Sequence, residues 1–218
     1  MKVFIVPLLA SLVASAAIDG LPEGTSIRRS LPSNYTISEI KWTIPITNGG
    51  PNHTLYGTVQ DVFAQINVLR AKQDLNPYAD PLNETLPHIN SANDDGDDAL
   101  LERRTYSKTI CNVGLSGPAN YNRIEQGVTY LQKVKGRCGN GPGPGNCGRI
   151  SCSYDAAIYW CNDNNYYVEY DCSSFAYYAN WGAMYCSSDP GDPNSNTKTW
   201  GQVFDTENFN VLVGHDSC

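Results

Sequence analysis

Hydrophobic and polar residues alternate along the last third of the chain, and this pattern predicts strands with one buried face. Between residues 150 and 160 the apolar positions share one parity, and they are Ile150, Cys152, Tyr154, Ala156, Ile158 and Trp160. We expect one strand here, bent near Ala156-Ala157, then a turn at residues 162–165 and a returning strand at residues 166–170. Residues 200–204 and 209–213 alternate in the same way and predict a second hairpin around residues 205–208.

Apolar residues recur at helical spacing in three other stretches. The first follows Thr58, the second follows Asn122, which together with Glu125 resembles a capping box, and the third follows Ser173 or Ser174. Their apolar faces consist of Val59, Val62, Phe63, Ile66 and Leu69, then Ile124, Val128 and Leu131, and then Phe175, Tyr178, Ala179, Gly182, Tyr185 and Cys186. Gly136 is the expected end of the second helix.

The element order after residue 105 is helix, hairpin, helix, hairpin. This order predicts an α+β fold in which two helices pack on one face of a roughly four-stranded antiparallel sheet. Before it, residues 42–46 are expected to form a short extended piece. Pro45 would confine that piece to a sheet edge, because proline has no N–H to donate to a second neighbour.

The N-terminal residues have the composition of a secretory signal. Residues 1–17 begin with Met-Lys, are almost purely apolar from Val3 to Val13, and end in the small residues 14–17. The apolar run is too short for a transmembrane helix, and a buried N-terminal helix would give the small residues no role. The expected location of the protein is therefore extracellular, with no stable membrane insertion.

Cysteines occur only in the second half of the chain. All eight lie between residues 111 and 218, at Cys111, Cys138, Cys147, Cys152, Cys161, Cys172, Cys186 and Cys218. An even number of cysteines in a chain with a signal peptide predicts a disulfide framework. A zinc site requires pairs of cysteines close together in the sequence, and this spacing lacks them, so we expect no metal and no cofactor. The 105 possible pairings stay open, although parity places Cys152 toward the core and predicts a helix-borne or core-facing partner for it.

A basic pair, Arg103-Arg104, separates the cysteine-free from the cysteine-rich part and follows an acidic stretch at residues 93–98. It resembles the site that kexin-type proteases cut, so we predict a pro-segment at residues 18–104 and a mature domain at residues 105–218. An EF-hand-like calcium loop across residues 91–102 is the poorer interpretation, because its first position is serine. The predicted pro-segment carries three glycosylation sequons, at Asn34, Asn52 and Asn83.

The motif that runs from Gly141 to Tyr154, together with residues 158–163, resembles a signature of small secreted cysteine-rich proteins of ascomycete fungi. The helix at residues 124–134 and the ending at residues 201–204 and 210–213 are also similar to that family. The helix and hairpin order is remotely similar to killer toxins of smut fungi and to effectors of plant-pathogenic fungi. The resemblance implies an effector-like or toxin-like protein that acts on a host or a competing microbe, without fixing any chemistry.

Charge and tyrosine content point to a binding function. The predicted mature domain has seven Lys and Arg against ten Asp and Glu, which gives a formal charge of −3, so we expect no nucleic-acid partner. It also holds eleven of the 14 tyrosines. The candidate recognition residues are Tyr166, Tyr167, Tyr170 and Tyr177, because exposed tyrosine suits recognition of a protein, glycan or lipid target. An equally good explanation is that these tyrosines cover a thin hydrophobic core in a small domain.

An enzyme is the alternative. Small secreted fungal ribonucleases combine a C-terminal histidine with Glu and Arg. This chain offers His215, the carboxylates of Glu125, Glu169, Glu207, Asp155 and Asp205, and the arginines Arg123, Arg137 and Arg149. It has no second histidine in the predicted mature domain, so we expect no catalytic residues and a solvated His215. A structural protein that stays in the cell wall is a further alternative.

Overall fold

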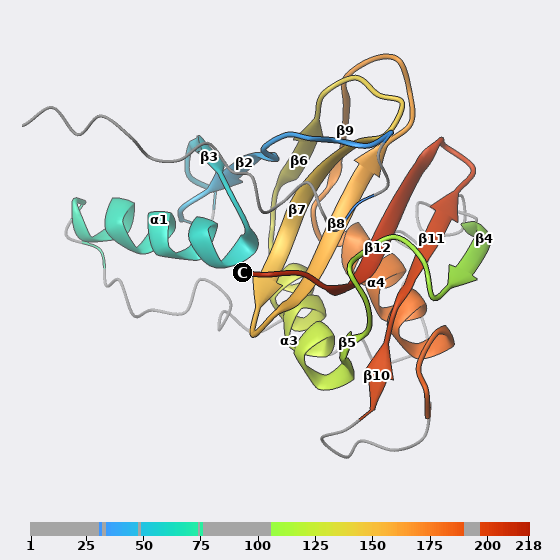
Figure 1. Cartoon of the computed structure of the whole chain (residues 1–218). Helices are drawn as coiled ribbons and strands as arrows, with labels where there is room; N and C mark the ends of the chain where they lie inside the picture. The colour runs from blue at the N-terminus through green and yellow to red at the C-terminus, as the bar shows by residue number, and fades with distance from the viewer. Residues whose placement is uncertain (1–30, 32–33, 48, 74, 76–105, 190–196) are drawn as a thin grey trace, which may run out of the picture.

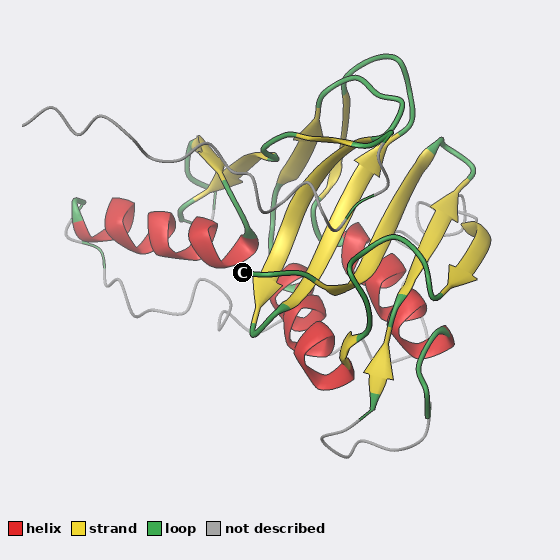
Figure 2. Ribbon diagram, viewed as in Figure 1, coloured by secondary structure: helices red, strands yellow, loops and turns green. Residues whose placement is uncertain are grey.

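The computed structural model describes residues 31, 34–47, 49–73, 75, 106–189 and 197–218. Its main element is a six-stranded sheet with the order β1-β7-β8-β12-β11-β4 (Figures 1 and 2). The strands are β1 (Thr36–Ile37), β4 (Tyr106–Cys111), β7 (Asn146–Ser153), β8 (Ala156–Asn162), β11 (Gly201–Asp205) and β12 (Phe209–His215). The sheet is mixed, because β1 runs parallel to β7 and the other pairs are antiparallel.

A second sheet has four antiparallel strands in the order β3-β2-β6-β9. They are β2 (Lys41–Pro45), β3 (Asn52–Tyr56), β6 (Arg137–Asn140) and β9 (Val168–Asp171). A short ladder joins β5 (Ala119–Asn120) to β10 (Lys198–Thr199). The described residues are thus α+β and disulfide-rich as predicted, but their sheets are larger than the single four-stranded antiparallel sheet expected from the sequence.

Three helices lie within the described residues: α1 (Val59–Ala71), α3 (Tyr121–Gln132) and α4 (Ser174–Tyr185). Thr58 caps α1 in a capping box with Asp61, so the predicted start of this helix is confirmed. The start of α3 was predicted two residues late, because Asn120 rather than Asn122 accepts the hydrogen bond from the Arg123 N–H. All three helices were expected, but the two-helix fold predicted after residue 105 did not include α1, which packs against α3 and β7 as a third helix.

The core lies between the two sheets and the helices. One cluster joins β2 and α1 to α3, α4 and the inner face of the six-stranded sheet, with Trp42, Ile124, Trp160 and Phe175 all buried. A smaller cluster covers the opposite face of that sheet and includes Tyr159 and Leu212. Both faces of β8 are therefore buried, and every residue of this strand is inaccessible to solvent.

Two strand predictions were wrong. Residues 150–160 form a hairpin rather than one bent strand, because Tyr154 and Asp155 both adopt positive φ values, 52° and 58°, and reverse the chain. Residues 168–171 pair with β6 and not with β8, so the chain crosses to the other sheet after Asn162. The final hairpin, β11 with β12, is confirmed.

The expectation that Pro45 keeps its strand at an edge was also wrong. β2 lies between β3 and β6, but its ladder with β6 covers only Lys41 to Thr43. Pro45 pairs on the other side, with Asn52 of β3. The strand can be internal because the proline lies beyond the end of the second ladder, where no N–H is needed.

Four disulfides link Cys111 to Cys186, Cys138 to Cys172, Cys147 to Cys161 and Cys152 to Cys218. The predicted framework is confirmed. The partner expected for Cys152 was wrong, because a bulge between Arg149 and Ser151 changes the parity of the strand and turns Cys152 toward the outer cluster. Cys147 and Cys161 lie on the side away from Ile150 and pair across β7 and β8.

Candidate functional site

The outer surface of α4 carries a row of large aromatic side chains. Tyr177, Trp181 and Tyr185 follow one another at intervals of four residues, which places them on one face of the helix. The opposite face is buried, since Phe175, Tyr178, Ala179 and Gly182 belong to the core. Tyr177 remains 48% exposed and Tyr185 61% exposed, whereas Trp181 is half-buried.

Tyr106 of β4 extends this row across the sheet. Its ring centroid lies 4.8 Å from that of Trp181, and the Trp181 ring is stacked on Tyr185 at 6.0 Å with an interplanar angle of 17°. The Trp181 indole N–H donates to the Thr109 hydroxyl at 3.2 Å, which fixes the central ring. We call Tyr106, Tyr177, Trp181 and Tyr185 the aromatic row.

The framework beneath the aromatic row is held by covalent and buried polar links. The Cys111–Cys186 disulfide joins the end of β4 to the C-cap of α4, next to Tyr185. On the buried side, the Tyr178 hydroxyl donates to Asp205 at 2.6 Å. The row is therefore presented by elements that cannot move independently, which lowers the entropy cost of binding a partner.

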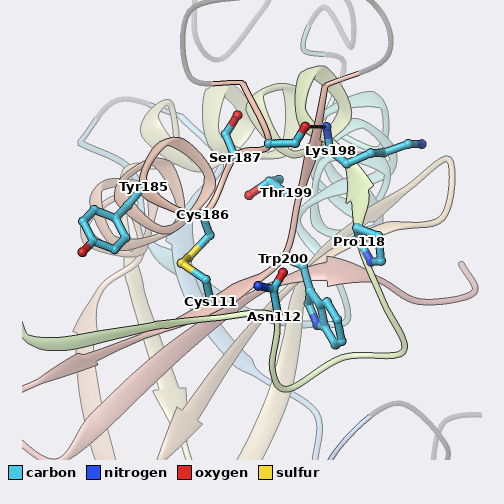
Figure 3. Close-up of a pocket in the computed structure, with 10 residues that line it drawn as sticks. Cys111, Asn112, Pro118, Tyr185, Cys186, Ser187, Lys198, Thr199 and Trp200 are labelled. Atoms are coloured by element: carbon cyan, nitrogen blue, oxygen red, sulfur yellow. Dashed lines mark hydrogen bonds between the residues drawn. A yellow bond between two sulfur atoms is a disulfide. The ribbon is translucent and has the colours of Figure 1, made fainter.

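A pocket of about 420 Å³ adjoins the end of the aromatic row. Figure 3 shows the Cys111–Cys186 disulfide and Trp200 in its wall, with the Tyr185 ring at the rim and turned away from the pocket. Asn112, Ser187, Ser188 and Lys198 supply its polar groups. An exposed apolar row with polar groups at one end has the composition of a protein-binding surface.

The four tyrosines predicted from the sequence do not gather in one place. Tyr177 belongs to the aromatic row, and Tyr166 and Tyr167 are exposed in the segment before β9. Tyr167 donates to Glu169 at 3.2 Å, and Arg137 contacts the same carboxylate group at 3.6 Å. Tyr170 packs instead against Trp160, Phe175 and Phe209, and burial together with the neighbouring Glu207 raises its pKa. Tyr170 is thus a partly buried aromatic of the core rather than a freely presented ring.

His215 is exposed at the end of β12, and its ring lies next to Ser116. The Ser116 hydroxyl donates to the His215 carbonyl oxygen at 2.7 Å and lies 2.8 Å from Nδ1. The same serine hydroxyl therefore lies within hydrogen-bond distance of both the ring and the backbone of His215, which joins the end of β12 to the loop that contains Ser116.

Arg149 is engaged in the neighbouring C-terminal contacts. It donates to the Ser217 carbonyl at 2.7 Å and lies 3.6 Å from Asp216, which accepts a 2.6 Å hydrogen bond from the buried Tyr159 hydroxyl. Burial and the Asp216 carboxylate raise the pKa of Tyr159. These contacts fix the C-terminal residues to β7 and β8.

Glu125 lies on α3, which packs on the inner face of the six-stranded sheet, whereas Arg149 contacts groups of the outer face. Burial raises the pKa of Glu125, and Tyr121 is hydrogen-bonded to it. Glu125 and Arg149 are thus on opposite sides of the sheet and do not form one cleft. Glu169 and Arg137, which were also candidates, form an ion pair at 3.6 Å between β9 and β6.

The remaining predicted sites are placed only in part. Asn34 and Asn52 are exposed, as a glycan acceptor must be, whereas Asn83, Arg103 and Arg104 lie outside the described residues. The described ranges contain no group of three or more residues that could hold a metal ion. Among the helices of the same ranges, none has the length and apolar character to cross a membrane.

Compared with protein-family models, with curated proteins and with solved structures, the chain matches none. The candidate site therefore depends on the geometry alone. Sequence reasoning identified only Tyr177 of the aromatic row. The spacing of Trp181 and Tyr185 by four residues could have revealed two more, but the contact with Tyr106 exists only in the folded protein.

Proposed function

We propose that this chain is a secreted recognition protein of effector or toxin type, and that it binds a protein target outside the producing cell through the aromatic row. The observation that carries the proposal is the contact of the exposed Tyr106 and Tyr185 rings with the half-buried Trp181 between them, on the helix face that also carries the exposed Tyr177. Tyr and Trp are the side chains most enriched among residues that dominate binding energy at protein interfaces.

Three further features support this proposal. The Cys111–Cys186 disulfide makes the surface rigid before binding, and the polar pocket beside Tyr185 provides hydrogen-bonding groups at its margin. Four disulfides suit a protein of an oxidising compartment, which agrees with the predicted signal sequence. A host or a competing microbe is the source of the target that the sequence resemblance implies.

The test compares binding of labelled variants to intact host cells and to cells of competing microbes, before and after those cells are treated with protease. One variant combines Tyr177→Ala with Tyr185→Ala. A second combines Tyr166→Ala with Tyr167→Ala and tests the other exposed tyrosine pair. The control is Tyr130→Ala, a tyrosine of α3 that is 43% exposed, lies near Phe63 of α1 and is not part of the aromatic row.

We expect protease-sensitive binding that weakens at least tenfold in the first variant and changes little in the control, because hot-spot aromatics contribute about 2 kcal/mol or more. Equal binding by the first variant and the control would contradict the role of the aromatic row. Loss of binding only in the second variant would show that the recognition surface is the segment before β9. Binding that survives protease treatment would indicate a glycan or lipid target.

A further inference from the structure

The N-terminal segment, residues 34–75, is built into the same fold as the cysteine-rich segment, residues 106–218. We propose that the N-terminal segment is a permanent, non-covalently held part of the folded protein, so that a chain cut between residues 76 and 105 remains a two-chain protein. Cleavage after Arg104 would then create a second subunit and would not release a leader.

Backbone hydrogen bonding joins the two segments at two places. β2 lies inside the four-stranded sheet, and Lys41, Trp42 and Thr43 pair with Gly139, Cys138 and Arg137 of β6. β1 pairs with β7 in the other sheet, where the Thr36 N–H donates to the Gly145 carbonyl and the Ser38 N–H to the Cys147 carbonyl, each at 2.9 Å. The N-terminal segment therefore contributes strands to both sheets (Figure 1).

The two segments also share one core. Ile40, Trp42, Val59 and Val62 of the N-terminal segment are at most 1% exposed and belong to the cluster that contains Ile124, Val128 and Ile150. Two glycines allow this close approach. A Cβ at Gly148 would lie 2.1 Å from a methyl carbon of Ile40, and a Cβ at Gly136 would lie 2.7 Å from Ile44. The cysteine-rich segment thus has a glycine at each of the two places where Ile40 and Ile44 of the N-terminal segment pack against it.

Side-chain hydrogen bonds complete the contact. Gln60 of α1 donates to the Ser151 hydroxyl at 2.9 Å and accepts from the Cys152 N–H at 3.3 Å. At the other end of the segment, Gln202 donates to the Tyr35 hydroxyl at 2.8 Å. These bonds give the packing a defined register in addition to its apolar area.

No disulfide ties the N-terminal segment to the rest of the protein. The first cysteine of the chain is Cys111, and all four bridges lie between residues 111 and 218. After a cut, only packing and hydrogen bonds would hold the two chains together. Departure of the N-terminal chain would leave β6 as an open edge and would expose the side of Ile150 and Val128 to water, which disfavours separation.

The experiment uses the full chain with residues 98–104 replaced by the recognition sequence of a site-specific protease, so that the cut does not depend on natural processing. The purified folded protein is cut to completion, as judged on a denaturing gel. It is then passed through size-exclusion columns in native buffer and in strong denaturant, both without reductant. We expect the fragments to elute together in native buffer and apart in denaturant.

Two variants test whether the contact between α1 and β7 holds the fragments together. Gln60→Ala removes both hydrogen bonds to β7 and should raise the dissociation constant of the cut protein about tenfold. Val68→Ala changes an exposed side chain of the same helix and should leave it unchanged. Separation of the unsubstituted fragments in native buffer at micromolar concentration, whether or not the larger fragment stays soluble, would overturn the proposal. Equal dissociation of the two variants would overturn the assigned contact between α1 and β7.

Discussion

The contact between Ile40 and Gly148 predicts a specific non-additive effect on stability. Gly148 of β7 has no side chain, and Ile40 occupies the space where one would be. Gly148→Ala would place its methyl group 2.1 Å and 2.3 Å from two side-chain carbons of Ile40 and 3.2 Å from the Ser38 carbonyl oxygen. Because Ile40 is only 1% exposed, it cannot swing into solvent to make room.

The magnitude follows from the packing. Overfilling a tight core costs about 1–3 kcal/mol, and the better strand propensity of alanine offsets about 0.5–1 kcal/mol of that cost. Ile40→Ala leaves a cavity and should cost about 2–5 kcal/mol. In the double variant the new methyl group fills part of that cavity, so its loss of stability should be about 1–3 kcal/mol smaller than the sum of the two single losses.

The assay is equilibrium unfolding of the intact chain in guanidinium chloride, followed by far-UV circular dichroism. Gly182→Ala serves as the control, because a Cβ there would also meet a buried side chain closely, at 2.9 Å from Val203, but would not contact Ile40. The losses from Gly182→Ala and Ile40→Ala should add. Additive losses from Gly148→Ala and Ile40→Ala would refute the packing of the N-terminal segment against β7.

Three further outcomes are expected. Burial raises the pKa of Glu125 above the unfolded value of about 4.3, so the folded state binds the proton more tightly and loses stability as the pH rises through the raised pKa. In urea unfolding, Glu125→Gln should therefore gain stability relative to the parent chain when the pH is raised from 4 to 7. A stability difference between the two proteins that is equal at both pH values would contradict this. Tyr159→Phe should cost about 1–3 kcal/mol by the same method, because Asp216 loses a buried donor, and a neutral result would show that water replaces it. The purified protein should not cleave RNA, and cleavage that disappears in His215→Ala would favour the ribonuclease alternative.

Local patterns predicted the elements that depend on local chemistry. The capping box of Thr58 and Asp61 lies before a helix with one apolar face, and α1 follows it. The final hairpin was also predicted, because β11 and β12 are neighbours in the chain with a short turn between them. The position of Asn120 as the cap of α3 was missed because two asparagines, Asn120 and Asn122, compete as caps on sequence alone.

The region from 150 to 160 shows why parity alone could not distinguish a bent strand from a hairpin. A two-residue turn at Tyr154-Asp155 reverses the parity of the inward positions, and the bulge between Arg149 and Ser151 reverses it once more. Ile150 lies before both reversals, and Ile158 and Trp160 lie after both, so all three share one parity and face the same core. Cys152 lies between the two reversals and faces the other side, which is why its partner was predicted wrongly.

Long-range pairing was the part that no local pattern could supply. β9 follows β8 in the chain but pairs with β6, and the Cys138–Cys172 bridge connects these two strands. The insertion of β2 beside β6 is equally non-local. For the same reason the candidate site was predicted only through Tyr177, since Tyr106, whose ring contacts Trp181, comes from a strand about 75 residues before that tryptophan.

The distribution of the disulfides has a consequence for the order in which the protein opens. A disulfide restricts the unfolded chain only between its two cysteines, so the four bridges stabilise residues 111–218 and leave the N-terminal segment to burial and hydrogen bonds. Local opening should therefore begin with the N-terminal segment, before β8 and β12 lose their pairing. Hydrogen exchange should find lower protection for the amides of β2 and α1 than for Tyr159 and Leu212, although Trp42 is as deeply buried as they are. Equal protection would mean that the two segments open only as one cooperative unit.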